Sequence, residues 1–229
     1  MMHEYALIVA GGSGSRMRSE VPKQFLLLQG KPVLMHTLET FHTYSPSVEI
    51  ILVLPENQLD TWSKLCQEYN FTIPHHIQRG GNTRFQSVKN GLALVINEGL
   101  VAIHDGVRPL LGQELLKKCF QEAALFGNSV AAVPAKDSLR WVEGYDNKSV
   151  ERKYYWQIQT PQTFRCSVIK EAYKTEERET FTDDASVAEA AGAHIHLTTG
   201  DYRNIKITTP EDLVIADALL SKPETKTAT

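Results

Sequence analysis

Residues 5–18 read YALIVAGGSGSRMR, an apolar run that passes directly into a glycine-rich loop. The first six residues form a short, mostly aliphatic run, which is typical of a strand buried on both faces of a sheet. Glycines after such a strand let the backbone approach a ligand closely and direct successive N–H groups toward an anion. This stretch therefore predicts an α/β sheet with a ligand site at the end of its first strand.

Short apolar runs and longer amphipathic stretches go on alternating along the chain. This order predicts parallel strands joined by crossover helices, in an open, mostly parallel twisted sheet with helices on both faces. The expected strands are residues 5–10, 48–54, 71–77, 101–104, 130–134 and 194–197. Helical spacing recurs at Leu34, Leu38 and Phe41, at Leu115, Cys119 and Ala123, and at Val187, Ala190 and Ala191, in a stretch opened by Thr182 and Asp183.

Residues 135–159 break this alternation. The segment is polar, carries several Lys, Arg, Tyr and Trp residues, and contains EGYDN at 143–147 as a turn between two short extended pieces. An insertion of this length without a core of its own is usually functional or docked on another subunit. We therefore expect a single domain over residues 1–229, with 135–159 as a protruding β-arm. Trp141 and Trp156 on this arm either pack against a partner subunit or stack on a base; we favour the partner contact, and hence a homodimer through the arm.

Composition limits the class of partner. Of the 229 residues, 24 Lys and Arg against 27 Asp and Glu give a formal net charge of −3, which argues against a broad basic surface for nucleic acid. Cys66, Cys119 and Cys166 lie far apart, as reduced buried thiols do. No leader or membrane-spanning stretch is evident. We expect a soluble, cytoplasmic protein that binds neither nucleic acid nor membrane, and whose anion sites are local clusters.

The first glycine loop carries such a cluster, with Arg16, Arg18 and Lys23 within eight residues. Neither common phosphate-binding signature fits: the P-loop requires Gly-Lys-Ser/Thr at its end, and the dinucleotide fingerprint requires a small residue where Met17 stands. A solvated basic loop and a polyphosphate site are the two interpretations. Because the loop follows a buried first strand, we favour the polyphosphate site.

Two more expected strands are followed by residues whose side chains could bind a ligand or take part in a reaction. The loop GGNTR at 80–84 is followed by Ser87, which would lie about one helical turn in and present its hydroxyl to the same crevice. HDGVRP at 104–109 places Asp105 and Arg108 three residues apart at a strand end. Such charges are costly to bury without a purpose. Asp105 is a candidate ligand of a divalent metal and Arg108 of an anionic group; the alternative is a structural Asp–Arg pair.

A lysine near the carboxyl end is the last candidate. Lys206 lies within NIKIT at 204–208, a short β-like run in which Asn204, Lys206 and Thr208 share one face. Its side chain either reaches into the crevice or extends along the surface to water.

These motifs together resemble the 2-C-methyl-D-erythritol 4-phosphate cytidylyltransferase family, from residue 5 to about residue 220. The shared stretches are the glycine loop with Arg16, PKQ at 22–24, GG at 80–81, HDGVRP at 104–109, TPQ at 160–162, TDDAS at 182–186 and NIK at 204–206. The resemblance implies the nucleotide-diphospho-sugar transferase α/β fold, which is Rossmann-like. It also implies transfer of a cytidylyl group from CTP to a sugar-alcohol phosphate, with release of pyrophosphate and with Mg²⁺ as cofactor.

The resemblance also assigns roles to individual positions. Arg16, Lys23 and Lys206 match the residues that hold the phosphates through the transition state, and Asp105 lies near the metal. The sequence has Asn82 where the family commonly has Asp, and Ser138 where Thr is common. The implied cytidine pocket comprises Ala10, Gly11, Gly12, Gly80, Asn82 and Ser87; the implied acceptor site comprises Asp105, Arg108 and Thr182, with Ser138, Arg152 and Thr160 contributed through the arm.

This chemistry agrees with the residue types. The nucleophile is a phosphate monoester oxygen that is largely ionised at neutral pH, so no general base is required. Two anions must approach each other, so preplaced cations are required. An alditol-phosphate acceptor such as ribitol 5-phosphate is the nearest alternative function. A non-catalytic CTP sensor is the alternative from another class, and a dinucleotide-dependent dehydrogenase is disfavoured by Met17.

Overall fold

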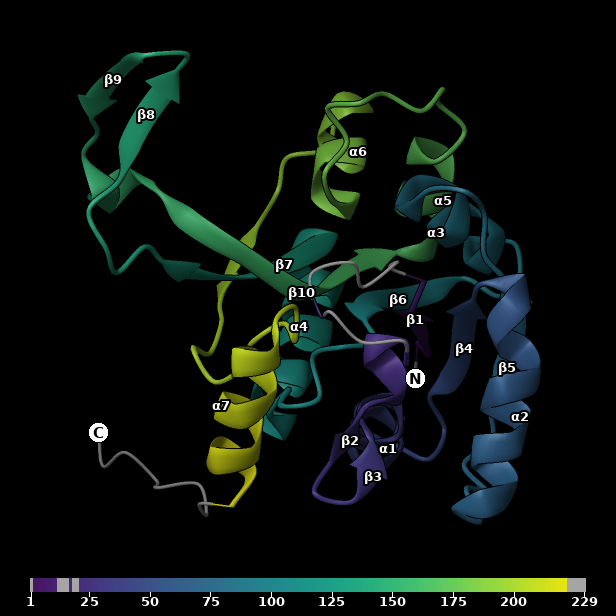
Figure 1. The fold of residues 1–229 in the computed structure, drawn as a ribbon. Helices are drawn as coiled ribbons and strands as arrows, with labels where there is room; N and C mark the ends of the chain where they lie inside the picture. Colours follow the sequence, from purple (N-terminus) through teal and green to yellow (C-terminus); the bar gives the residue numbers. More distant parts are fainter. Residues whose placement is uncertain (1, 12–16, 18–20, 222–229) are drawn as a thin grey trace.

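The computed structural model describes residues 2–11, 17 and 21–221. Within them the main sheet has seven strands, in the order β11-β7-β10-β6-β1-β4-β5 (Figure 1). β10 is antiparallel to both of its neighbours, and every other pair is parallel. The prediction of an open, mostly parallel α/β sheet is therefore confirmed. The strands are β1 (His3–Val9), β4 (Glu49–Leu54), β5 (His76–Arg79), β6 (Gly99–Asp105), β7 (Asn128–Pro134), β10 (Trp156–Arg165) and β11 (Leu197–Thr199).

Helices cover both faces of this sheet. Because side chains alternate along a strand, Ala6 and Ile8 of β1 join one apolar cluster, and Tyr5 and Leu7 join another. The first cluster packs against α1 (Val33–Tyr44), α2 (Leu59–Glu68) and α4 (Gln113–Phe126); the second packs against α3 (Arg84–Leu92), α5 (Cys166–Ala172) and α6 (Asp184–Ala190). The predicted helical spacings fall in α1, α4 and α6, and Asp183 is the N-cap of α6.

Smaller elements complete the chain. The short strands β2 (Leu27–Leu28) and β3 (Lys31–Pro32) form a ribbon, and α7 (Pro210–Leu220) lies beside it. Larger elements are connected by 3-10 turns, among them η2 (Lys23–Phe25), η3 (Glu56–Gln58) and η4 (Arg152–Tyr154). The predicted excursion is a hairpin of β8 (Arg140–Glu143) and β9 (Asp146–Ser149), which projects away from the main sheet (Figure 1).

Two strand predictions were displaced. Residues 71–75 form no strand because Pro74 lacks the N–H that a ladder requires, so β5 begins at His76. The last strand begins at Leu197 rather than residue 194. There the Asn128 side chain replaces the ladder, since its Nδ2 donates to the His194 carbonyl and its Oδ1 accepts from the His196 N–H, each at 2.8 Å.

Two further interpretations were wrong. β10 was not predicted as a strand; its first four residues were assigned to the excursion, and it returns the chain into the middle of the sheet (Figure 1). The run 204–208 is not a strand: Asn204 and Ile207 are buried rather than Asn204, Lys206 and Thr208 together. Cys119 and Cys166 are buried and Cys66 is half-buried, all as free thiols. No helix of the described residues is long and apolar enough to cross a bilayer.

Candidate functional site: two adjoining clefts

A polar cleft of about 360 Å³ lies where β1 and β6 end. Its position agrees with the rule that ligands of open α/β sheets bind beyond the carboxyl ends of the strands. Segments from the first third, the middle and the end of the chain meet here. The lining residues are Val9, Ala10, Gly11, Lys23, Gln24, Gly81, Asn82, Thr83, Arg84, Ser87, Asp105, Val107 and Lys206.

The second glycine loop needs its glycines for close packing. A Cβ at Gly80 would lie 2.9 Å from the Ser87 hydroxyl oxygen, and one at Gly81 would lie 2.3 Å from the Gln86 Cβ. Ser87 fastens the loop, because its hydroxyl accepts from the Gly81 N–H at 3.1 Å and donates to the Thr83 carbonyl at 2.8 Å. Its proton is thus committed to the protein, and an oxygen lone pair is what remains for a ligand.

The 3-10 turn η2 supplies the opposite wall of this cleft. Lys23 is 8% exposed and lines the cleft near Gln24, which is fully buried. Gln24 donates to the Ala10 carbonyl at 2.8 Å and to the Gln58 side chain. These bonds fasten the turn that carries Lys23 to the end of β1.

A second cleft of about 260 Å³ adjoins the first. It runs from β6 and β10 toward the segment that precedes α6. The two clefts share Arg84, Asp105 and Lys206, so these three charged side chains stand at the junction. The other lining residues of the second cleft are Arg108, Ile158, Gln159, Thr160, Gln162, Thr182 and Asp183.

Asp105 is the electrostatic centre of the junction. Its Oδ2 lies 3.0 Å from the Lys206 ammonium and 3.3 Å from Arg108 Nε, and its Oδ1 lies 4.0 Å from Arg84 Nε. Burial by itself raises the pKa of this carboxyl, but Lys206, Arg84 and Arg108 outweigh burial and lower the pKa well below its usual range. Asp105 is therefore ionised throughout the physiological range.

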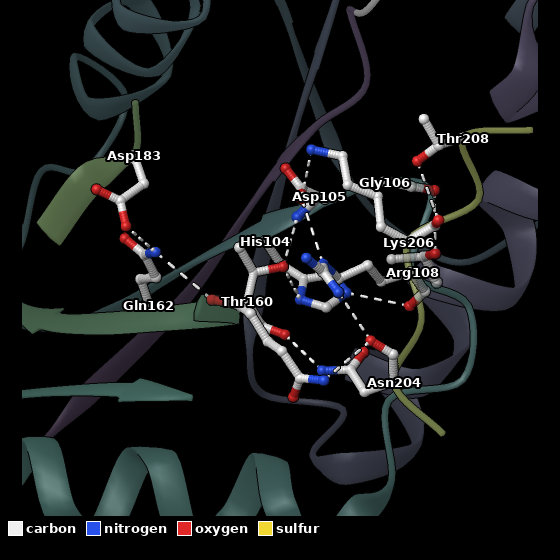
Figure 2. Close-up of polar contacts among 12 residues, drawn as sticks. His104, Asp105, Gly106, Arg108, Thr160, Gln162, Asp183, Asn204, Lys206 and Thr208 are labelled. Carbon is white, nitrogen blue, oxygen red and sulfur yellow. Dashed lines mark hydrogen bonds and ion pairs between the residues drawn. The ribbon is translucent and has the colours of Figure 1, made fainter. Parts of the chain in front are cut away.

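Beneath Asp105, a buried polar network fixes the end of β6 that carries it (Figure 2). The Thr160 hydroxyl oxygen accepts from the Asp105 N–H at 3.0 Å and lies 3.0 Å from His104 Nδ1, while His104 Nε2 lies 3.2 Å from the Arg108 carbonyl. Burial lowers the pKa of His104 to about 4, so the ring is neutral. A neutral ring satisfies both contacts if Nε2 carries the proton and Nδ1 accepts from Thr160.

The same network reaches the carboxyl-terminal segment. Asn204 is fully buried, and its Nδ2 donates to the Thr160 carbonyl at 2.7 Å. Its own carbonyl accepts from Arg108 Nη1 at 2.8 Å (Figure 2). Asn204 thereby positions Lys206 two residues further on. The Lys206 ammonium reaches Asp105 at the crevice, while 41% of the side chain stays exposed to solvent.

The structure brings most of the predicted site residues together. Lys23, Asp105 and Lys206 line the first cleft with Ala10, Gly11, Asn82 and Ser87, while Arg108, Thr160 and Thr182 line the second. The predicted residues Gly12 and Arg16, with Arg18, lie outside the described residues. The Asp105–Arg108 pair that was the structural alternative is present, although both residues also line a cleft. Gly80 donates its N–H to the Leu54 carbonyl at 2.8 Å, next to the cleft wall.

The three residues assigned to the arm lie in two different places. Thr160 belongs to β10, inside the sheet of its own chain, and is 4% exposed. Ser138 and Arg152 lie on the exposed arm and line neither of the two clefts; Arg152 donates to the Lys136 carbonyl. The assignment of Thr160 to the arm was thus wrong, because the strand that carries it was not recognised.

Sequence reasoning missed several residues of this site. Arg84 stood in a motif that was identified, but its place between two clefts was not foreseen. His104, Gln162 and Asp184 also lie within the identified motifs, and membership of a motif was the only signal that the sequence offered. Their burial, which requires hydrogen-bond partners, is seen only in the structure.

A glycine loop, clustered cations and two adjoining clefts at the carboxyl ends of an α/β sheet define a nucleotide-binding α/β protein. The sequence profile of the 2-C-methyl-D-erythritol 4-phosphate cytidylyltransferase family matches residues 5–222. The chain therefore belongs to this family, and the expectation drawn from the motifs is confirmed over the alditol-phosphate alternative.

Individual relatives agree with the family match. The chain is 52% identical to 2-C-methyl-D-erythritol 4-phosphate cytidylyltransferase of Bacteroides fragilis over 94% of its own length and 98% of the relative's. It is 49% identical to the protein of that name from Bacteroides thetaiotaomicron, over 96% of its own length and 100% of the relative's. Among solved structures, 4-diphosphocytidyl-2C-methyl-D-erythritol synthase from Anaerococcus prevotii superposes with a TM-score of 0.81 at 30% identity, covering 96% of this chain and 97% of that one. 2-C-methyl-D-erythritol 4-phosphate cytidylyltransferase from Thermus thermophilus superposes with a TM-score of 0.78 at 30% identity, covering 96% of this chain and 100% of that one.

Proposed function

We propose that this protein transfers the cytidylyl group of CTP to 2-C-methyl-D-erythritol 4-phosphate and releases pyrophosphate. The observation that carries the proposal is the pair of adjoining clefts that share Arg84, Asp105 and Lys206. A transferase of this kind must hold two anionic substrates so that their reacting groups meet, and two clefts with a charged junction suit that requirement.

In this proposal CTP occupies the first cleft. The cytidine lies against Ala10, Gly11, Gly81 and Asn82, which line this cleft. Gly80 is assigned to the same pocket by its place in the family motif. The triphosphate extends toward Lys23 and Lys206, and Arg16 is assigned to it by its place in the family motif. A pyrimidine is expected to fit this narrow site better than a purine.

The acceptor occupies the second cleft in this proposal. Its phosphate is met by Arg108 and the junction cations, and Thr182 offers a hydroxyl from the rim. One acceptor phosphate oxygen then attacks the α-phosphorus, the bond from that phosphorus to the bridging oxygen breaks, and pyrophosphate leaves with the bonding electrons. The acceptor oxygen is already ionised, so no side chain has to remove a proton.

Charge is the obstacle that these residues overcome. Two unit charges 4 Å apart repel by about 4 kcal/mol at an effective dielectric of 20. Lys23, Lys206 and Arg16 are proposed to offset this repulsion and to stabilise the charge that develops on pyrophosphate. Their fixed positions matter because preplaced cations need no reorganisation during the reaction.

The cofactor in this proposal is Mg²⁺, with Asp105 as its protein ligand. Mg²⁺ typically takes one or two carboxylates and completes its shell with water and substrate phosphates. Asp105 suits this pattern, because the carboxyl is ionised and lines the cleft. No group of three potential metal ligands occurs among the described residues, so phosphate oxygens are needed as further ligands. Bound Mg²⁺ supplies charge neutralisation at the phosphates.

A homodimer through the arm completes the proposal. The arm exposes several large side chains, among them Trp141, Val142 and Tyr145 with 43%, 65% and 105% exposure. Exposed aromatic groups on a projecting hairpin favour a protein contact. Ser138 and Arg152 would then reach the acceptor of the partner subunit. Location in the cytoplasm belongs to the same proposal.

Pyrophosphate release tests the proposed function directly. The purified protein is incubated with CTP and Mg²⁺, and with methylerythritol phosphate, ribitol 5-phosphate or no acceptor in parallel. We expect release with methylerythritol phosphate and little with the other two, less with ATP than with CTP, and none after chelation of Mg²⁺. Comparable kcat/KM for the two acceptors would contradict the proposed specificity. Sedimentation at micromolar concentration tests the dimer.

A further inference from the structure

Arg84, which lines both clefts, forms an ion pair with Asp184 behind it. They are 100 residues apart in sequence, at the first positions of α3 and α6. Asp184 is fully buried. Its Oδ1 accepts from Arg84 Nη1 at 2.8 Å and its Oδ2 from Arg84 Nη2 at 2.6 Å, a bidentate arrangement that fixes the guanidinium in both position and orientation.

A third group secures this pair. Tyr173 directly follows α5, and its hydroxyl donates to Asp184 Oδ1 at 2.6 Å. Gln162 holds the start of the same helix from the side of β10. Its Nε2 donates to Asp183 Oδ2 at 2.9 Å (Figure 2), and its Oε1 accepts from the Ala185 N–H at 2.8 Å. Hydrogen bonds from Tyr173 and Gln162 therefore fix Asp184 and the start of α6, and Asp184 in turn fixes the guanidinium of Arg84.

Within this group of residues, Arg84 is the one that lines the two clefts. Both terminal nitrogens are committed to Asp184, so Nε points to the junction and lies 4.0 Å from Asp105 Oδ1. The side chain is 30% exposed and lines both clefts. Its helix also follows directly on the glycine loop with Asn82, whereas the helix of Asp184 follows directly on Thr182.

We propose that Asp184 is a positioning residue for the transfer reaction, which holds the Arg84 charge at the junction and ties the acceptor-side segment to the nucleotide-side loop. The inference rests on the proposed function. A bare buried pair is weak evidence for stability, since burial of two charges offsets their attraction. What this pair provides instead is a fixed geometry between the two clefts, whose substrates must react with each other.

The test measures turnover and stability in the same variants. Asp184→Asn preserves shape but removes the charge and one acceptor oxygen, and Arg84→Lys preserves the charge but removes the fork. We expect each to lower kcat roughly 10- to 100-fold at a temperature where circular dichroism shows a fully folded protein, as small displacements near reacting groups do. The double variant is expected to lose no more than the worse single variant, because the two residues act as a unit.

Two further variants keep the outcome decisive. Tyr173→Phe retains the ion pair and removes one hydrogen bond, so it serves if Asp184→Asn does not fold; we expect a loss in kcat of roughly 2- to 10-fold. Glu122→Gln is the matched control, because Glu122 accepts from His196 at 3.0 Å and neither residue lines either of the two clefts. The kcat of this variant is expected to stay within about twofold of wild type.

The outcomes are distinguishable. Wild-type kcat in folded Asp184→Asn, or in folded Tyr173→Phe where Asp184→Asn does not fold, would overturn the positioning role. Additive losses in the double variant would also overturn it. An inactive wild-type protein would instead overturn the proposed function, and the inference with it.

Discussion

The cleft and the arm of this protein use polar residues in opposite ways. Around Asp105, the side chains of Asp105, Arg108, Thr160 and Asn204 are buried, and partners from distant segments of the chain hold them. On the arm, β8 and β9 are exposed at every residue and bond mainly to each other. The difference teaches that the cleft is preorganised within one chain, whereas the hairpin of the arm is not enclosed by other parts of the described chain.

The largest expected effect is on turnover, at the charged junction. Lys206→Ala and Lys23→Ala are each expected to lower kcat by roughly 10²- to 10³-fold, the loss seen when one preorganised transition-state donor is removed. Steady-state kinetics with CTP and methylerythritol phosphate measure this loss. Lys148→Ala, on the arm with its ammonium 4.9 Å from the Trp141 ring centroid, is the control and should change kcat little. Turnover within threefold of wild type for both cleft variants would refute their assignment.

The next effect separates the arm from the cleft by substrate. Arg152→Ala is expected to raise the KM for the acceptor by roughly 10- to 100-fold, since a charged hydrogen bond contributes about 1.5–3 kcal/mol. The KM for CTP should stay the same. Because the side chain is exposed in one chain, the free energy of unfolding should hardly change. An equal rise in both KM values would place Arg152 outside the acceptor site.

A third effect concerns stability beneath Asp105. Thr160→Val leaves the Asp105 N–H and His104 Nδ1 without their partner, so we expect the free energy of unfolding to fall by about 2 kcal/mol. Urea unfolding monitored by circular dichroism measures the change. Thr163→Val in the same strand is the matched control: Thr163 is fully buried and its hydroxyl has no partner, so this change should be neutral or stabilising.

The smallest effect is expected on the arm itself. Asn147→Ala removes the bond that Asn147 Oδ1 accepts from Arg140 Nε at 2.5 Å between exposed residues. The free energy of unfolding should change by less than about 0.5 kcal/mol, as at most surface positions. Urea unfolding of the dilute protein measures it. A loss as large as that of Thr160→Val would mean that the arm is as tightly organised as the cleft.

Local pattern was sufficient for much of this fold. The apolar runs that became β1, β4, β6 and β7 were identified within one or two residues, because strands buried on both faces are continuously apolar. The glycine loops and the HDGVRP motif were also found, since glycines and paired charges at strand ends are local signals. β10 escaped notice because Gln157, Gln159, Thr160 and Gln162 make it look polar, and their partners lie elsewhere in the sequence.

Residue type and order along the chain thus settled the class of sheet, the family and the ends of the strands where ligands bind, since these depend on periodicity and on motifs a few residues long. Three-dimensional packing decided the rest: that Lys206 turns to Asp105, that Thr160 lies within the sheet, and that Arg84 meets Asp184. The physical reason is that such contacts join residues 55 or more positions apart. No local pattern encodes them, and they form only once the sheet has brought those segments together.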